Sequence, residues 1–284
     1  MDIVDSQIHL HITLNAEETL ASMNSLGIQA AVIDEFWGFD EKTGRGNPGI
    51  LLPEHRAFRA TAPGAELASI RNPERFSYLL RIHHRDPQLT AGVKAVADAP
   101  HARAVRIVAR MEEDVKELAD GAYTPVFDAA ADNGLPVFTM VPRVAPLLRP
   151  YAQAHPETTI VVDHVGMPEN DAEFEDVLRL ADLPNVAIKW GHGPELFHAD
   201  TYPFEPAVDK LLRVLDAFGR ERVMWASDYS AISGDHRWAD ELFSIRESTR
   251  LSAQDKEWIL GGTVRKILDW PRPAELYTPP KIRH

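Results

Sequence analysis

Residues 158–166, Thr-Thr-Ile-Val-Val-Asp-His-Val-Gly, carry the pattern on which the fold prediction rests. Ile160, Val161 and Val162 are apolar without alternation, which is typical of a parallel strand buried on both faces. A carboxylate, an imidazole and a glycine follow, where such a strand would enter its loop. Comparable segments recur along the chain, and we expect strands at Ile3–Ile12, Ala31–Phe36, Phe76–Ile82, Arg103–Val108, Leu135–Val141, Thr158–Val165, Val186–Trp190 and Arg222–Tyr229.

Amphipathic segments lie between these strands and show helix-boundary residues. Ala16–Leu26 follows Asn15, a good N-cap residue, and ends at Gly27, a common C-terminal stop. The other expected helices are Pro125–Asn133, Asp171–Ala181, Pro206–Phe218, Arg237–Thr249 and Ala253–Leu268. Strands that alternate with helices indicate a parallel sheet, and eight such strands close a barrel. We therefore predict a single-domain (β/α)8 TIM barrel over residues 1–284, with a proline-rich extended tail at 271–284.

The main alternative is an open, doubly wound parallel sheet. That fold usually carries a glycine-rich phosphate-binding turn after its first strand. Here the first strand runs into His11-Ile12-Thr13-Leu14, which contains no glycine. The sequence therefore favours the barrel over the open sheet.

Composition narrows the classes of function. The chain has 284 residues, 44% of them apolar, which suits one barrel with a large core. Its net charge of −13 argues against nucleic acid or an anionic membrane as a partner. It contains no cysteine, which excludes disulfides, thiolate nucleophiles and cysteine-ligated metals. Residues 1–5 lack the features of a signal peptide, and no segment approaches the roughly 20 apolar residues of a membrane span. We expect a cytoplasmic protein that binds a small molecule, as a monomer or a homo-oligomer.

The first strand supplies one catalytic candidate. In a parallel barrel the active site gathers at the carboxyl ends of the strands. This strand ends in Gln7-Ile8-His9-Leu10-His11, and its period of two places Gln7, His9 and His11 on one face. Polar side chains in register on a buried strand are costly unless they serve a site or are fully hydrogen-bonded. We therefore assign a catalytic role to His9.

The sixth and eighth strands supply two more candidates. Neighbouring residues of a strand face opposite ways, so only one of Asp163 and His164 is expected to point inward. We choose His164 and expect Asp163 to cap the following helix. Asp228 falls where the apolar segment 223–226 enters its loop. A carboxylate beside imidazoles activates water, either as a general base or as a metal ligand.

Several polar residues near this trio are weaker candidates. Arg106 interrupts an apolar strand, so it either pairs with a carboxylate or binds an anionic substrate. His192, within Trp190-Gly191-His192-Gly193, lies on the rim after the seventh strand. The remaining strand ends offer His83 and His84, candidates for the mouth. They also offer Asp34 and Glu35, one of which could reach the site, although we favour solvated loop acids.

Four segments together resemble the amidohydrolase superfamily, and within it the amidohydrolase-2 group of barrel enzymes. They are Val4–His9 (Val-Asp-Ser-Gln-Ile-His), Val162–Gly166 (Val-Asp-His-Val-Gly), Arg222–Asp228 (Arg-Val-Met-Trp-Ala-Ser-Asp) and Leu260–Leu268 (Leu-Gly-Gly-Thr-Val-Arg-Lys-Ile-Leu). The resemblance spans nearly the whole chain, and the lactonase branch is the most similar. It implies a hydrolase whose site residues lie at the ends of strands one, six and eight.

The chain departs from the family pattern Asp-x-His-x-His on the first strand. Aligned on Asp5, the first histidine position holds Gln7 and the second holds His9, while His11 falls two residues further on. The resemblance implies that zinc or manganese, if present, is held by His9, His11, His164 and Asp228. A neutral amide oxygen is a weak zinc ligand, and the lactonase branch includes members that work without a metal. We therefore predict no metal cofactor, with a single divalent ion as the alternative.

The leading hypothesis is hydrolysis of a small lactone that carries a carboxylate or several hydroxyls. Asp228 takes a proton from the attacking water, and His9 and His164, with Gln7, polarise the carbonyl oxygen. Arg106 and His192 hold an anionic group of the substrate. Two alternatives stay open. One is a metal-dependent amidohydrolase or a decarboxylase of an aromatic acid, and the other is a barrel without catalysis that serves as a binding module.

Overall fold

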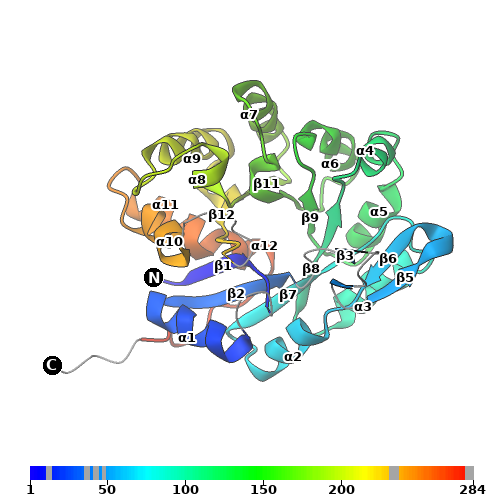
Figure 1. Ribbon diagram of the computed structural model, residues 1–284, viewed down its shortest axis with the longest axis horizontal. Helices are drawn as coiled ribbons and strands as arrows, with labels where there is room; N and C mark the ends of the chain where they lie inside the picture. Colours follow the sequence, from blue (N-terminus) through cyan, green and yellow to red (C-terminus); the bar gives the residue numbers. More distant parts are fainter. Residues whose placement is uncertain (11–14, 35–38, 41–44, 47–48, 230–236, 279–284) are drawn as a thin grey trace.

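The computed structural model describes residues 1–10, 15–34, 39–40, 45–46, 49–229 and 237–278. Its centre is a sheet of eight parallel strands in the spatial order β1-β2-β7-β8-β9-β10-β11-β12 (Figure 1). They span Ile3–Ile8 (β1), Ile28–Asp34 (β2), Phe76–Arg81 (β7), Ala102–Val108 (β8), Val137–Met140 (β9), Ile160–Val162 (β10), Val186–Trp190 (β11) and Val223–Trp225 (β12). Ser6 Oγ donates to the Trp225 carbonyl at 2.6 Å, and the Asp228 N–H donates to the Gln7 carbonyl at 3.1 Å. These contacts join the first and last strands, so the predicted (β/α)8 barrel is confirmed.

Three strands end three or four residues earlier than predicted. β1 stops at Ile8, β10 at Val162 and β12 at Trp225. Beyond the last two strands the backbone becomes left-handed, with φ of 49° at His164 and 48° at Asp228. A residue in this region cannot continue an extended strand, so the chain turns there. Each turn brings a polar side chain to the mouth of the barrel.

The helices form an outer ring around the strands (Figure 1). They span Ala16–Leu26 (α1), Pro63–Arg71 (α2), Leu89–Asp98 (α3), Glu112–Ala119 (α4), Thr124–Asp132 (α5), Arg149–Ala154 (α6), Asp171–Leu178 (α7), Gly193–Leu196 (α8), Glu205–Phe218 (α9), Trp238–Arg246 (α10), Ala253–Glu257 (α11) and Thr263–Ile267 (α12). Asn15 caps α1 as predicted, because its Oδ1 accepts the N–H groups of Glu17 and Glu18 at 3.0 Å. The helix predicted at Ala253–Leu268 is interrupted by a wide turn at Trp258–Gly262, where Gly261 lets the backbone of Asp2 approach closely.

Alternating residues of the strands fill the barrel interior in layers. The lower layer is apolar and draws on every strand: Val4, Ala30, Val32, Leu79, Ala104, Phe138, Val161, Ala187 and Met224. Two residues further along four of these strands, on the same face, lie Asp34, Arg106, Asp163 and Lys189. All four are buried. The barrel is therefore plugged by apolar side chains and carries a charged layer above them.

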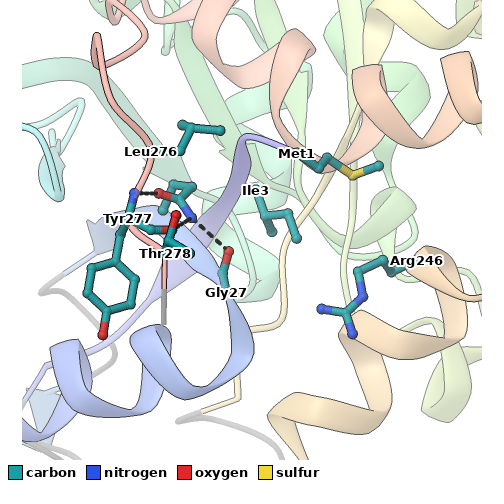
Figure 2. Close-up of a pocket in the computed structure, with 8 residues that line it drawn as sticks. Met1, Ile3, Gly27, Arg246, Leu276, Tyr277 and Thr278 are labelled. Atoms are coloured by element: carbon teal, nitrogen blue, oxygen red, sulfur yellow. Dashed lines mark hydrogen bonds between the residues drawn. The ribbon is translucent and has the colours of Figure 1, made fainter. Parts of the chain in front are cut away.

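Additional segments lie at the two ends of the barrel. The antiparallel hairpin of β5 (Gly49–Leu52) and β6 (Ala57–Ala60) follows the short pair β3 (Phe39–Asp40) and β4 (Arg45–Gly46), and it lines the cavity at the mouth. At the opposite end the tail 271–278 lies against Gln29. The Gln29 amide accepts the Tyr277 N–H at 2.6 Å and donates to the Tyr277 carbonyl at 3.0 Å, beside a cavity of about 360 Å³ (Figure 2). Among the described residues, no helix is long and apolar enough to cross a membrane.

Candidate active site

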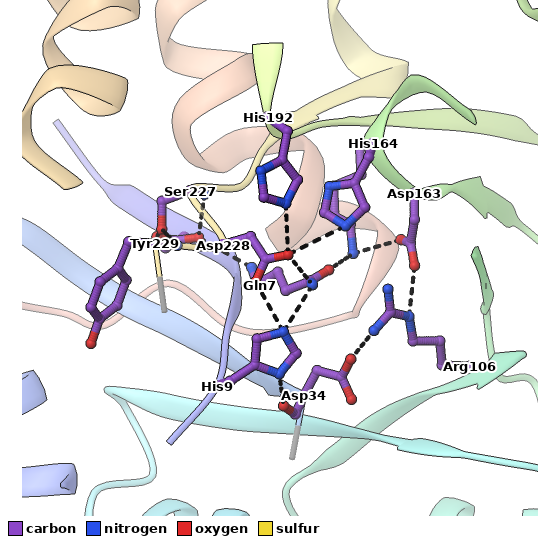
Figure 3. Close-up of polar contacts among 12 residues, drawn as sticks. Gln7, His9, Asp34, Arg106, Asp163, His164, His192, Ser227, Asp228 and Tyr229 are labelled. Carbon is purple, nitrogen blue, oxygen red and sulfur yellow. Dashed lines mark hydrogen bonds and ion pairs between the residues drawn. The ribbon is translucent and has the colours of Figure 1, made fainter. Parts of the chain in front are cut away.

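The charged layer is a network of four buried side chains at the level where the barrel opens. Arg106 Nε donates to Asp163 Oδ2 at 2.7 Å, and its Nη1 contacts Asp34 Oδ2 (Figure 3). Lys189 Nζ lies 2.5 Å from Asp163 Oδ1. Two cations and two carboxylates therefore balance in charge. Burial would raise the pKa of Asp163, but Arg106 and Lys189 outweigh it and hold that pKa below its usual value. Burial lowers the pKa of Lys189 to about 8.

Arg106 resolves one of the alternatives that the sequence left open. It pairs with carboxylates, Asp34 on β2 and Asp163 after β10, and it also lines the cavity. The expectation that Asp34 is a solvated loop acid is wrong, because its side chain is 1% exposed. Glu35 lies outside the described residues.

His164 and Asp163 both reach the site, contrary to the prediction that only one would. Asp163 lies two residues after Val161 and, like it, faces the barrel interior. It pairs with two cations instead of capping a helix. His164 arrives from the next position because its backbone is left-handed, which breaks the two-residue alternation. Its ring packs against Gly191, where a Cβ atom would stand 2.7 Å from His164 Nδ1. Glycine is therefore required at position 191 for this placement.

Asp228 is the centre of the site. Its Oδ2 accepts Gln7 Nε2 at 2.8 Å and lies 3.0 Å from His192 Nε2 and 3.5 Å from His164 Nε2 (Figure 3). Its Oδ1 lies 2.9 Å from His9 Nε2. Burial would raise the pKa of Asp228, but the hydrogen bond from His192 and the charge of His9 outweigh it and hold that pKa well below 3.8. The carboxylate is therefore ionised at neutral pH, surrounded by three imidazoles and one amide.

The two buried histidines present defined nitrogens to Asp228. His9 Nδ1 lies 2.5 Å from the Asp34 carbonyl, which only accepts, so Nδ1 carries a hydrogen and Nε2 faces Asp228. His164 Nδ1 has no hydrogen-bond partner, and its Nε2 is the nitrogen turned to the carboxylate. Burial lowers the pKa of His164 well below 6.5, so its ring is neutral at pH 7. His164 therefore offers one Nε2–H donor.

Asp5 stabilises the seam between the first and last strands. Its Oδ1 accepts the N–H groups of Gln7 and Ser227 at 3.1 and 3.0 Å. Its Oδ2 accepts Ser227 Oγ at 2.5 Å and Trp238 Nε1 at 2.7 Å. Burial raises the pKa of Asp5 to about 6 despite these bonds. The aspartate of the first-strand motif thus places Gln7 and Asp228 without facing the cavity mouth itself.

A divalent ion fits three residues of the site. Ligand atoms of His164, His192 and Asp228 lie within 4.8 Å of one another. Two imidazoles and a carboxylate with a further open position form a common catalytic zinc set, in which ligand atoms stand roughly 3.3 Å apart at zinc–ligand distances of about 2.0–2.1 Å. Of the predicted ligands His9, His11, His164 and Asp228, this group contains His164 and Asp228. His192 is an additional member, and His11 lies outside the described residues. Gln7 points its amide nitrogen, not its oxygen, at Asp228.

A cavity of about 1660 Å³ opens above these residues. Gln7, His9, His164, His192 and Asp228 lie at its base. Its charged lining is mixed, with the basic residues Arg56, Arg81, Arg85, Arg106, Arg110 and Lys116 and the acidic residues Glu112, Glu113, Asp114 and Glu195. Apolar contacts come from Leu51, Phe58, Met111, Met140 and Met167. His83 reaches this cavity, whereas His84 binds Glu117 at 2.6 Å.

Lys189 is the site residue that sequence reasoning missed, and Asp34 was considered for the site but expected to be a solvated loop acid. Lys189 is the penultimate residue of an otherwise apolar strand, and its side chain is wholly buried. Counting by twos from the apolar layer would have found both residues, because Val32 and Ala187 precede them by two positions on the same face. The signal in the sequence was the alternation of side chains along the strand, which puts residues two apart on the same face.

The family model described as "Amidohydrolase" matches residues 57–270, and the chain belongs to this family. An L-fucono-1,5-lactonase of Burkholderia ambifaria is 31% identical over 150 residues, which are 49% of this chain and 50% of that protein. A second L-fucono-1,5-lactonase, from Burkholderia multivorans, is 30% identical over 155 residues. These relatives agree with the predicted lactonase-like branch. The chain spans about half the length of the curated relatives it matches.

Solved structures confirm the fold. An amidohydrolase of Burkholderia multivorans with bound HEPES superposes with a TM-score of 0.74 at 17% identity, over 95% of this chain and 100% of that one. A second crystal form of that protein has bound zinc and a TM-score of 0.72. The 5-carboxyvanillate decarboxylase of Sphingomonas paucimobilis has a TM-score of 0.62 at 17% identity, over 94% of this chain and 99% of that one.

Proposed function

We propose that this protein hydrolyses a small lactone with water activated by Asp228. The observation that carries the proposal is the environment of this carboxylate, which is ionised, buried and faced by donors, yet lies at the base of a large cavity. A carboxylate in such a position accepts a proton from a water molecule while neighbouring N–H groups stabilise charge on a carbonyl oxygen. The lactonase relatives support the same reaction class.

The reaction balances with the residues of the site alone. Water attacks the lactone carbonyl carbon, and Asp228 takes one of its protons. His164 Nε2–H donates to the carbonyl oxygen as it gains negative charge. The Gln7 amide nitrogen donates to Asp228 Oδ2 and lies 3.3 Å from His9 Nε2, so it holds these two groups in place. His9 Nε2, 2.9 Å from Asp228, shares the transferred proton. The ring carbon–oxygen bond then breaks, the proton returns to the leaving oxygen, and a hydroxy acid is the product.

We propose that the reaction proceeds without a metal. Asp228 Oδ2 already accepts the Gln7 amide, and Gln7 stands where the family pattern has a histidine. The alternative keeps an ion on His164, His192 and Asp228. There it would lower the pKa of a bound water and polarise the substrate carbonyl. This metal-dependent alternative includes a decarboxylase of an aromatic acid. The observation that favours it is the set His164, His192 and Asp228, which fits a divalent ion.

We propose an anionic substituent on the substrate from the arginines that line the cavity. Arg81 and Arg106 are register partners on β7 and β8, so their side chains rise from neighbouring strands at the same level. Arg110 lies close enough to lower the pKa of Arg81, although burial is the larger cause of its fall to about 10. Asp34 and Asp163 already balance the charge of Arg106, and Asp114 acts to raise the pKa of Arg81. Arg81 and Arg110 line the cavity, and guanidinium groups bind carboxylates well, so we propose them as the contacts for a carboxylate on the lactone.

A substrate screen with a matched pair of variants tests the proposal. Sugar lactones and carboxylated lactones are offered with and without a chelator, and acid release is followed. We expect Asp228→Asn to lower kcat by about 10²–10⁴, the usual contribution of a general base. Asp128→Asn, an exposed carboxylate on α5, keeps the wild-type rate. No lactone turnover by the wild-type protein, or near-normal turnover by Asp228→Asn, would overturn the proposal. Release of CO₂ from aromatic acids that stops with chelator would establish the alternative.

A further inference from the structure

Lys189 is a wholly buried cation that the lactonase mechanism does not use. It rises from β11, two residues beyond Ala187 of the apolar layer, and cannot contact solvent or substrate. Its Nζ lies 2.5 Å from Asp163 Oδ1 and contacts Gln7 Oε1 on β1. Burying an ammonium is costly, and its three N–H donors need acceptors besides Asp163. Gln7 Oε1 supplies one of them, which ties the direction of the Gln7 amide to Lys189.

The Lys189 contact determines which end of the Gln7 amide faces the catalytic carboxylate. An ammonium group only donates, so the amide group beside it must present its oxygen. The nitrogen is then turned to the other side, where it donates to Asp228 Oδ2 at 2.8 Å. If the amide rotated by half a turn, a donor would face the ammonium and an acceptor would face the carboxylate, and both contacts would become repulsive. The order Asp163–Lys189–Gln7–Asp228 thus has one consistent arrangement of hydrogens.

The same contact disfavours a divalent ion near β1. With Lys189 bound to it, the oxygen of Gln7 is unavailable as a ligand. The ammonium also places a fixed positive charge one side chain away from Asp228, and like charges repel strongly where water is excluded. His164, His192 and Asp228 can hold an ion without Gln7. The charge of Lys189 is therefore expected to lower the affinity of this set for the ion and not to abolish binding.

We propose that Lys189 is a positioning residue that orients Gln7 as a hydrogen-bond donor to Asp228 and, through its charge, weakens the affinity of the site for a divalent metal ion. This inference rests on the proposed function only for its effect on turnover. Its effect on metal affinity stands whether or not the substrate is a lactone.

Zinc affinity tests the proposal without any substrate. Lys189→Met alone leaves the buried network with an excess of negative charge and risks misfolding, so Asp163→Asn accompanies it and restores the balance. Zinc affinity is measured by competition with a chromophoric chelator for the wild-type protein and for Asp163→Asn/Lys189→Met, because both leave the buried network balanced in charge. We expect the double variant to bind zinc at least tenfold more tightly. Equal affinities would overturn the proposed effect of the Lys189 charge.

A double-mutant cycle on turnover tests the orientation of Gln7. The cycle combines Gln7→Leu with the charge-balanced change Asp163→Asn/Lys189→Met, which removes Lys189 together with its counterion. If Lys189 acts through Gln7, removing it after Gln7→Leu changes kcat by less than twofold, whereas removing it from the protein with Gln7 lowers kcat by tenfold or more. Independent losses that multiply would overturn the positioning role. A wild-type protein that hydrolyses no lactone refutes the proposed function, and the zinc comparison then still decides the inference about Lys189.

Discussion

An Arg106→Met substitution would leave two buried carboxylates short of a countercharge. Arg106 contacts Asp34 and Asp163, and the side chains of these three residues are at most 6% exposed. Asp163 keeps Lys189 as a partner, so Asp34 bears most of the loss. Removing one partner of a buried ion pair costs about 3–5 kcal/mol, because the other charge remains buried without compensation. At about 2 °C per kcal/mol for a chain of this size, the melting temperature falls by roughly 6–10 °C.

A compensating variant separates charge balance from packing. Arg106→Met/Asp34→Asn removes one cation and one anion and leaves the Asp163–Lys189 pair neutral. We expect it to recover at least half of the stability lost by Arg106→Met, and the Asp34 carbonyl that holds His9 is unchanged. Urea unfolding followed by circular dichroism gives both free energies. Arg179→Met, which breaks an exposed pair with Asp176, is the control and costs about 0–1 kcal/mol. A double variant that is less stable than Arg106→Met would refute the charge-balance reasoning.

Two further predictions concern His83 and Gly191. Burial holds the pKa of His83 at about 3, below the unfolded value of 6.5, so its contribution to stability is fully present above pH 6.5 and is lost as the pH falls. Between pH 6.5 and 4 we expect His83→Gln to lose about 3 kcal/mol less unfolding free energy than the wild type, and identical pH profiles in urea unfolding would contradict this. Gly191→Ala places a Cβ atom 2.7 Å from His164 Nδ1, so steady-state kinetics should show kcat lowered at least tenfold with the fold intact. Gly134→Ala, at φ +64° with open space around it, should affect stability alone, and equal rates for the two variants would show that the placement of His164 does not matter.

The order of the elements followed from local patterns. Short β-rich segments marked all eight parallel strands, several of them as continuous apolar runs, and Asn15 and Gly27 marked the ends of α1. Such signals depend on interactions within a few residues, so the sequence expresses them directly. The ends of the strands were overestimated because the left-handed residues there, His164 and Asp228, are not glycines. Their conformation is imposed by packing at the mouth and not by local preference.

The network beneath the site required the tertiary structure. Arg106 was predicted to need a carboxylate or an anionic ligand, but its partners Asp34 and Asp163 are 72 and 57 residues away in the chain. Only the closed barrel brings these side chains to one level. The left-handed turn that admits His164 beside Asp163 is likewise a three-dimensional effect, and it overrode the expectation from strand alternation.

The amino-acid sequence by itself determined the barrel and the trio His9, His164 and Asp228, because apolar strands that end in polar residues can place them only at the mouth. The tertiary structure decided how the trio is held: His192 joins it, and Lys189 sets the Gln7 amide. The physical reason is that hydrogen-bond direction and charge balance depend on which side chains meet across the barrel. Residues 182 positions apart, such as Gln7 and Lys189, leave no trace of that meeting in the local sequence.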